Sequence, residues 1–143
     1  MAVKPENTFI RAVHNKFGAS APYYEKNNNP YHSGTPDVFY SGVKGDLWVE
    51  YKYQSVPLTK KKALSLDLSA RQREWLNNRY GEGRNVAVIL GAPDGALIFR
   101  DLEWNSPSVH GTPLTPSQVA SWIVGQTGQE CKTCLDLLTQ FIS

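Results

Sequence analysis

The segment Leu47–Tyr53 constrains the fold of this 143-residue chain more than any other part of the sequence. It reads Leu-Trp-Val-Glu-Tyr-Lys-Tyr, a composition typical of a strand. Alternation divides its side chains between two faces, with Leu47, Val49, Tyr51 and Tyr53 on one and Trp48, Glu50 and Lys52 on the other. Two opposite charges therefore interrupt an otherwise core-like strand, and such charges need partners or a ligand.

The other elements follow from apolar spacing and turn signals. Helices are expected over about residues 5–17, from a Ser69 capping box to about Gly81, from Thr115, and over about residues 129–141. Strands are expected over residues 37–40, 47–53, 86–90 and 96–99, the first two as an antiparallel hairpin, while Ala19–Gly34 reads as a loop. This order predicts an α/β protein bordering on α+β, a mixed sheet flanked by helices in a single domain, residues 1–143.

Composition and the chain start narrow the class of protein. No apolar run approaches the roughly 20 residues that span a bilayer. The start lacks the apolar region of a secretory signal, so we expect a cytoplasmic protein. The two cysteines, Cys131 and Cys134, form half of a zinc-binding pattern at most, and we expect reduced thiols.

The net charge of +2 conceals an uneven distribution. Residues 1–90 carry 13 of the 15 Lys and Arg and 8 of the 13 Asp and Glu, whereas residues 91–143 carry 2 basic and 5 acidic residues. A basic first part suggests a polyanionic partner, although a solvated charged face is the simpler explanation.

Asp37 follows Gly34-Thr35-Pro36 and opens the strand before Leu47–Tyr53. If the two strands pair, Asp37 approaches Glu50. Two close carboxylates raise each other's pKa, and a divalent cation relieves their repulsion. An all-oxygen site suits Mg²⁺ or Mn²⁺. With Lys52 to orient the attacking water, such a group could hydrolyse a phosphodiester.

Pro36-Asp37, then 12 residues, then Glu50-Tyr51-Lys52 resembles the PD-(D/E)XK signature of the restriction-endonuclease-like nuclease superfamily. The order of predicted elements also resembles its α-β-β-β-α-β core, with one early strand either a short piece around Pro22–Tyr24 or absent. The resemblance covers about residues 4–100 and leaves about 105–143 as a C-terminal helical extension. Phage-type or virus-type replication-repair nucleases and Holliday-junction resolvases look most similar, and a phage-encoded protein would act in its host's cytoplasm.

The resemblance implies roles for the central residues. Asp37, Glu50 and the Tyr51 backbone carbonyl would bind Mg²⁺, with Mn²⁺ able to substitute. Lys52 would position water and stabilise the transition state, giving a 5′-phosphate and a 3′-hydroxyl. Glu6 would reach the site from the first helix and Gln72 from the helix after it. From the residues alone, Glu6 is a first-turn acid favoured by the helix dipole and Gln72 closes a capping box.

Several further residues are candidates for contact with DNA. They are Lys60, Lys61, Lys62, Arg71 and Arg73 as phosphate contacts, and Tyr31 and His32 in the expected loop Ala19–Gly34. A single site of this kind cuts one strand, so cutting both strands invites a homodimer.

These patterns together predict a Mg²⁺-dependent DNA endonuclease. The substrate is either a DNA sequence, as for restriction or phage-type homing enzymes, or a branched structure such as a junction. A non-catalytic nucleic-acid-binding module on the same fold is the alternative. A protein-interaction domain, in which Glu50 and Lys52 form only an ion pair, is a third possibility.

Overall fold

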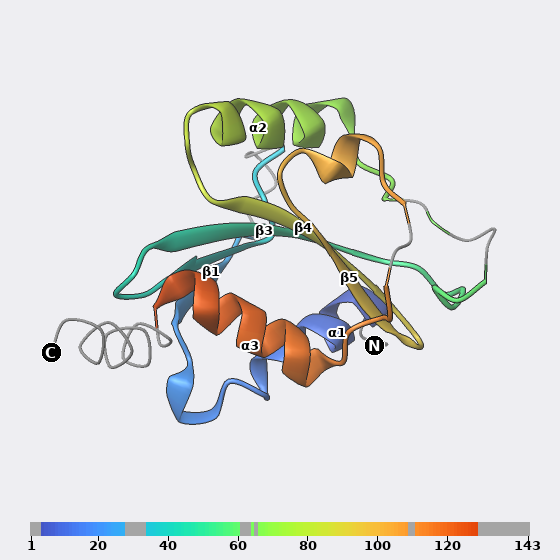
Figure 1. Ribbon diagram of the computed structural model, residues 1–143, viewed down its shortest axis with the longest axis horizontal. Helices are drawn as coiled ribbons and strands as arrows, with labels where there is room; N and C mark the ends of the chain where they lie inside the picture. Colours follow the sequence, from blue (N-terminus) through green and yellow to red (C-terminus); the bar gives the residue numbers. More distant parts are fainter. Residues whose placement is uncertain (1–3, 28–33, 61–63, 65, 109–110, 129–143) are drawn as a thin grey trace, which may run out of the picture.

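The computed structural model describes residues 4–27, 34–60, 64, 66–108 and 111–128 (Figure 1). The helices are α1 (Pro5–His14), α2 (Ala70–Gly81) and α3 (Pro116–Thr127), with short 3₁₀ turns at Gly18–Ser20 and Glu103–Asn105. The strands are β1 (Tyr23–Lys26), β2 (Val38–Ser41), β3 (Asp46–Tyr53), β4 (Val86–Ala92) and β5 (Gly95–Phe99). They form a mixed five-stranded sheet flanked by helices, which confirms the expected α/β class.

The strands lie side by side in chain order, from β1 at one edge to β5 at the other. The β3–β4 pair is parallel and every other neighbouring pair is antiparallel, so the predicted hairpin of β2 and β3 is confirmed. The interpretation of Ala19–Gly34 as one loop was wrong at β1, where the alternative of a short early strand around Pro22–Tyr24 is confirmed with the bounds Tyr23–Lys26. That strand is four exposed residues long, so it has no buried apolar alternation and depends on pairing with β2.

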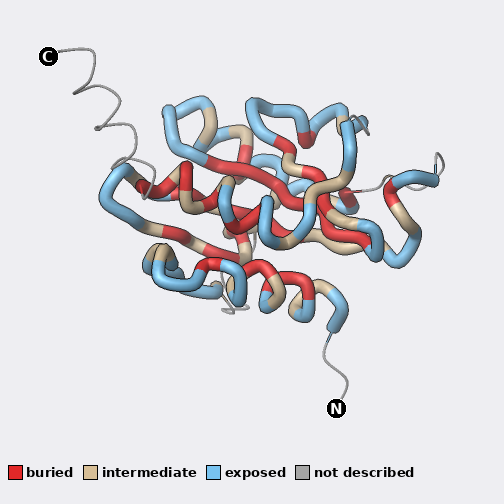
Figure 2. Tube along the Cα trace, turned by 60° about the horizontal axis from the view of Figure 1, so that its bottom comes forward, coloured by how far each residue is buried: buried red, intermediate tan, exposed pale blue. Residues whose placement is uncertain are grey.

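The helices cover the sheet on two sides. In Figure 1, α2 lies above the sheet while α1 and α3 lie below it. The lower layer buries Phe9, Val13 and Ile123 against β3, and the upper layer buries Leu76 and Trp104 against β4. Every residue of β4 is buried, as the continuous buried stretch in Figure 2 shows. Strand β3, which carries Glu50 and Lys52, pairs with this buried strand.

One helix boundary differs from expectation. Helix α1 ends at His14 instead of residue 17, although Phe17 still packs into the core. Helix α3 begins directly after Thr115, as predicted, and closes the lower core with Val119. The expected helix over residues 129–141, with Cys131 and Cys134, lies outside the described residues. None of the helices in the described part is long and apolar enough to cross a membrane.

Candidate active site

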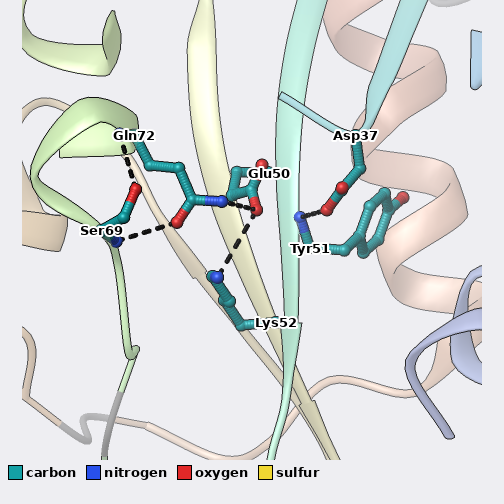
Figure 3. Close-up of polar contacts among 6 residues, drawn as sticks. All are labelled: Asp37, Glu50, Tyr51, Lys52, Ser69 and Gln72. Carbon is teal, nitrogen blue, oxygen red and sulfur yellow. Dashed lines mark hydrogen bonds and ion pairs between the residues drawn. The ribbon is translucent and has the colours of Figure 1, made fainter. Parts of the chain in front are cut away.

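Strand pairing brings Asp37 and Glu50 together. The β2–β3 register sets Val38 opposite Val49, so Asp37, one residue before β2, lies opposite Glu50. Val38 and Val49 point into the lower core, which leaves the two acids on the α2 side of the sheet. The Asp37 carboxylate accepts a hydrogen bond of 2.9 Å from the Tyr51 backbone N–H (Figure 3). The Asp37 carboxylate is thus held by the backbone of β3, the strand that carries Glu50.

The turn before Asp37 requires a glycine. Gly34 has a φ of +92°, and a Cβ atom there would lie 2.8 Å from the backbone oxygen of Arg71. The turn therefore packs directly on the first turn of α2. This contact fixes the position of Asp37 relative to the helix that carries Gln72.

Burial and mutual repulsion disfavour charge on both acids. Glu50 is only 2% exposed, and its burial raises its pKa to about 9, with the charge of Asp37 adding to the effect and Lys52 opposing it. Burial also raises the pKa of Asp37, while the hydrogen bond from Tyr51 lowers it. The pair therefore holds a proton readily when no cation is present.

Two side chains converge on Oε2 of Glu50 (Figure 3). The Lys52 ammonium lies 3.7 Å away, and the Gln72 amide nitrogen donates a hydrogen bond of 3.0 Å. The carbonyl of the same Gln72 amide accepts a hydrogen bond from the Ser69 backbone N–H and closes the capping box of α2. The Gln72 amide therefore closes the predicted capping box through its carbonyl and contacts Glu50 through its nitrogen.

The donor atoms suit a hard divalent cation. Oε1 of Glu50 is buried with no hydrogen-bond partner among the described residues, and the Glu50 carboxyl group is close enough to Asp37 for the charge of Asp37 to raise its pKa. The described part of the chain holds no group of three or more His, Cys, Asp and Glu side chains arranged for a metal. Two carboxylates are nevertheless what a Mg²⁺ site that also uses substrate phosphates commonly has. A cation would neutralise the pair and satisfy the unpartnered oxygen.

Glu6 lies within electrostatic range of this site. It is half-buried in the first turn of α1, and burial raises its pKa, with the charge of Asp37 as the next cause. Its charge also raises the pKa of Glu50. Lys26 lies on strand β1, in a segment that was expected to be a loop. Its charge lowers the pKa of both Glu6 and Asp37. A strand prediction that extended to Lys26 would have placed this residue near Glu6 and Asp37.

Some of the candidates for DNA contact lie outside the residues that the structure describes. Lys60, Arg71 and Arg73 are exposed, and the two arginines flank Gln72 on α2. Lys61, Lys62, Tyr31 and His32 lie outside the described residues. The structure thus puts two cations on the helix that faces Glu50.

A hydrogen-bonded chain lies on the opposite face of the sheet, where the sequence suggested no site. The Tyr51 and Tyr40 hydroxyls are 2.6 Å apart, and Nε2 of His14 is 2.8 Å from the Tyr40 hydroxyl. These hydrogen bonds link α1, β2 and β3. Glu6 lies on α1, Asp37 directly precedes β2, and Glu50 lies on β3. The hydrogen bonds therefore tie together the backbones that position the acids.

His14 should make stability depend on pH. Burial lowers its pKa to about 4 from 6.5, with a further contribution from the charge of Lys26. Between these two pKa values His14 is protonated in the unfolded chain but not in the folded chain. Stability is therefore lost as pH falls from about 6.5 to 4. Urea unfolding of His14→Gln, which keeps a polar partner for Tyr40, should give a slope in this window shallower by about 1 kcal/mol per pH unit. Equal slopes for the two proteins would contradict the assignment.

The two functions of Gln72 can be separated. Ser69→Ala removes only the cap and should cost about 1 kcal/mol of stability with little change in catalysis. Gln72→Ala should cost a similar amount and also slow DNA cleavage about tenfold, because Glu50 loses a donor that orients it. Chemical unfolding and single-turnover cleavage measure the two effects. Equal cleavage rates for both variants would show that the contact with Glu50 has no catalytic effect.

Comparisons with known proteins add a fold-level similarity. No protein-family model and no curated protein matches the sequence. Among solved structures, the chain is similar to Hjc of Archaeoglobus fulgidus, a Holliday junction resolvase from an archaeal hyperthermophile. The TM-score is 0.48 at 22% identity, over 65% of this chain and 73% of that one. The function proposed below rests on the geometry of the site.

Proposed function

We propose that this chain is a divalent-metal-dependent DNA endonuclease that hydrolyses phosphodiester bonds and leaves 5′-phosphates. The observation that carries the proposal is the convergence of a buried carboxylate pair, Asp37 and Glu50, with the ammonium of Lys52. Burying two like charges beside one cation costs stability, so their retention needs a function. Holding a divalent cation against a phosphate is such a function.

Asp37 and Glu50 would hold the cation, together with the Tyr51 carbonyl. The N–H and C=O of one strand residue point to the same side, and the Tyr51 N–H points toward Asp37. Strand β2 begins only at Val38, so no residue of β2 pairs with Tyr51 and its carbonyl faces the same region. Mg²⁺ or Mn²⁺ bound there would lower the pKa of the attacking water and screen the phosphate charge.

Side chains of this protein would orient the attacking water, stabilise developing charge and contact phosphates. The Lys52 side chain is 19% exposed, so its ammonium reaches the open side of the site, where it can orient a water molecule and stabilise developing negative charge. Gln72 holds the Glu50 carboxylate in place. Arg71, Arg73 and Lys60 are exposed and would contact phosphates of the DNA, which gives affinity rather than sequence choice.

Incubation of supercoiled plasmid and of a synthetic four-way junction with Mg²⁺ or with EDTA tests the proposal. We expect cleavage in Mg²⁺ and none in EDTA, and no cleavage by Asp37→Asn in either buffer. Linearisation at one plasmid position would identify a sequence-specific enzyme, whereas junction cleavage without linearisation would identify a structure-specific one. Equal cutting by wild type and Asp37→Asn would defeat the assignment.

We further propose that the active form on duplex or junction DNA is a homodimer, since a single site cuts one strand and a two-fold pair would cut both. Sedimentation velocity at micromolar concentration, with and without DNA, should detect a species with twice the mass of one chain. Monomer alone in both conditions would exclude the dimer.

A further inference from the structure

A cavity of about 570 Å³ opens beside the candidate active site, within the size range of small-ligand sites. Its walls come from the turn between β2 and β3, the loop between α2 and β4, and the end of α3. These segments meet at the left of Figure 1. None of its lining residues is a catalytic candidate, so it is a separate feature on the same strands.

One wall of the cavity is aromatic. Phe39 and Trp48 are partly buried, with ring centroids 4.6 Å apart, and the Trp48 ring also contacts Trp75 at a centroid distance of 5.3 Å. Supported aromatic rings facing a cavity are suited to stacking a planar group.

The rest of the cavity lining is largely polar and includes two cations. Lys44 and Arg84 are exposed there, and the Lys44 ammonium is anchored by donating to the Gly125 carbonyl at 3.1 Å. The Asp46 carboxylate, held by the Ser41 hydroxyl at 2.7 Å, supplies one acceptor and one negative charge. Aromatic rings for a base and cations for a phosphate are the two elements of single-stranded nucleic-acid sites.

The position of the cavity connects it to cleavage. Trp48 and Glu50 are two residues apart on one face of β3, a distance of about 7 Å along the strand. In duplex DNA neighbouring bases stack about 3.4 Å apart, which leaves no room for a protein side chain between them. A base that enters the cavity must therefore be unstacked and unpaired.

We infer that this cavity binds one unpaired nucleotide next to the cleaved phosphodiester, with the base on Phe39 and Trp48 and a phosphate at Lys44 and Arg84. The inference rests on the proposed function and narrows its substrate to DNA with a single-stranded nucleotide at the cleavage point. Paired duplex then binds through phosphate contacts alone.

The test uses Asp37→Asn protein in Mg²⁺, so that cleavage does not interfere with binding. One DNA carries 2-aminopurine as the unpaired nucleotide of a flap, and its match carries 2-aminopurine at the same position in full duplex. We expect the fluorescence to change on binding only with the flap. In the same background, Phe39→Leu and Arg84→Gln should each weaken flap binding by about tenfold and duplex binding by less than about twofold. The matched control Arg100→Gln, which removes a charge from an exposed position outside the cavity, should weaken neither selectively.

Three results would overturn the inference. They are an unchanged 2-aminopurine signal with the flap, an equal loss of affinity for both DNAs in the cavity variants, or the same selective loss in Arg100→Gln. Each leaves the nuclease proposal standing if the DNA binds and wild type cleaves it, whereas absence of any DNA binding defeats both proposals. Arg84 is exposed, so Arg84→Gln decides the matter even if Phe39→Leu fails to fold.

Discussion

Glu50→Gln is expected to reduce the rate of DNA cleavage by about 10³-fold, equivalent to about 4 kcal/mol of transition-state stabilisation. The substitution keeps the size of the side chain but removes the charge that would bind a cation beside Asp37. We therefore expect Mn²⁺ affinity, measured by calorimetry, to fall at least about tenfold. DNA binding should be retained, since no phosphate contact is lost.

The same variant should be more stable than wild type in EDTA at pH 8. The raised pKa of Glu50 means that folding favours its protonated form, so its ionisation costs stability as pH rises from about 4.5 toward 9. Glutamine removes that cost. Glu74→Gln, an exposed change on α2, is the matched control and should alter neither cleavage nor stability. Wild-type cleavage by Glu50→Gln would contradict its assignment to the cation.

Lys52→Met is expected to slow cleavage by about 10²-fold without weakening Mn²⁺ binding. Methionine fills a similar volume, but it cannot orient water or stabilise negative charge. Because the ammonium lies 3.7 Å from the Glu50 carboxylate and lowers the pKa of that group, its loss should also raise the pH at which cleavage becomes half-maximal.

The matched control for Lys52 is Lys16→Met, an exposed substitution beyond the end of α1. It should leave the rate and its pH profile unchanged. A parallel loss of cleavage and Mn²⁺ affinity in Lys52→Met would show that Lys52 supports the carboxylates rather than the reacting groups. The two principal variants are thus distinguished by metal binding.

Local signals in the sequence predicted the parts of the site that depend on local structure. The alternation in Leu47–Tyr53 put Glu50 and Lys52 on one face, and the short connection predicted the hairpin that sets Asp37 opposite Glu50. The Ser69–Gln72 capping box was predicted correctly because it involves residues within one helical turn. Strand β1 could be offered only as an alternative to a loop, around Pro22–Tyr24, because its four exposed residues carry no hydrophobic alternation.

Tertiary packing determined the side-chain contacts between these segments. Whether the Gln72 amide reaches Glu50 depends on how α2 lies over β3, and no spacing along the chain encodes that distance. The contact of His14 with Tyr40 likewise depends on α1 packing beneath the sheet. The cavity likewise brings Arg84 and Gln126 to the distant hairpin that carries Phe39, Lys44 and Trp48. The sequence alone therefore determined which candidate residues come together on β3 and directly before β2, because strand alternation and hairpin pairing are local. The tertiary structure decided which distant side chains support and surround them, because those contacts exist only when helices pack on the sheet.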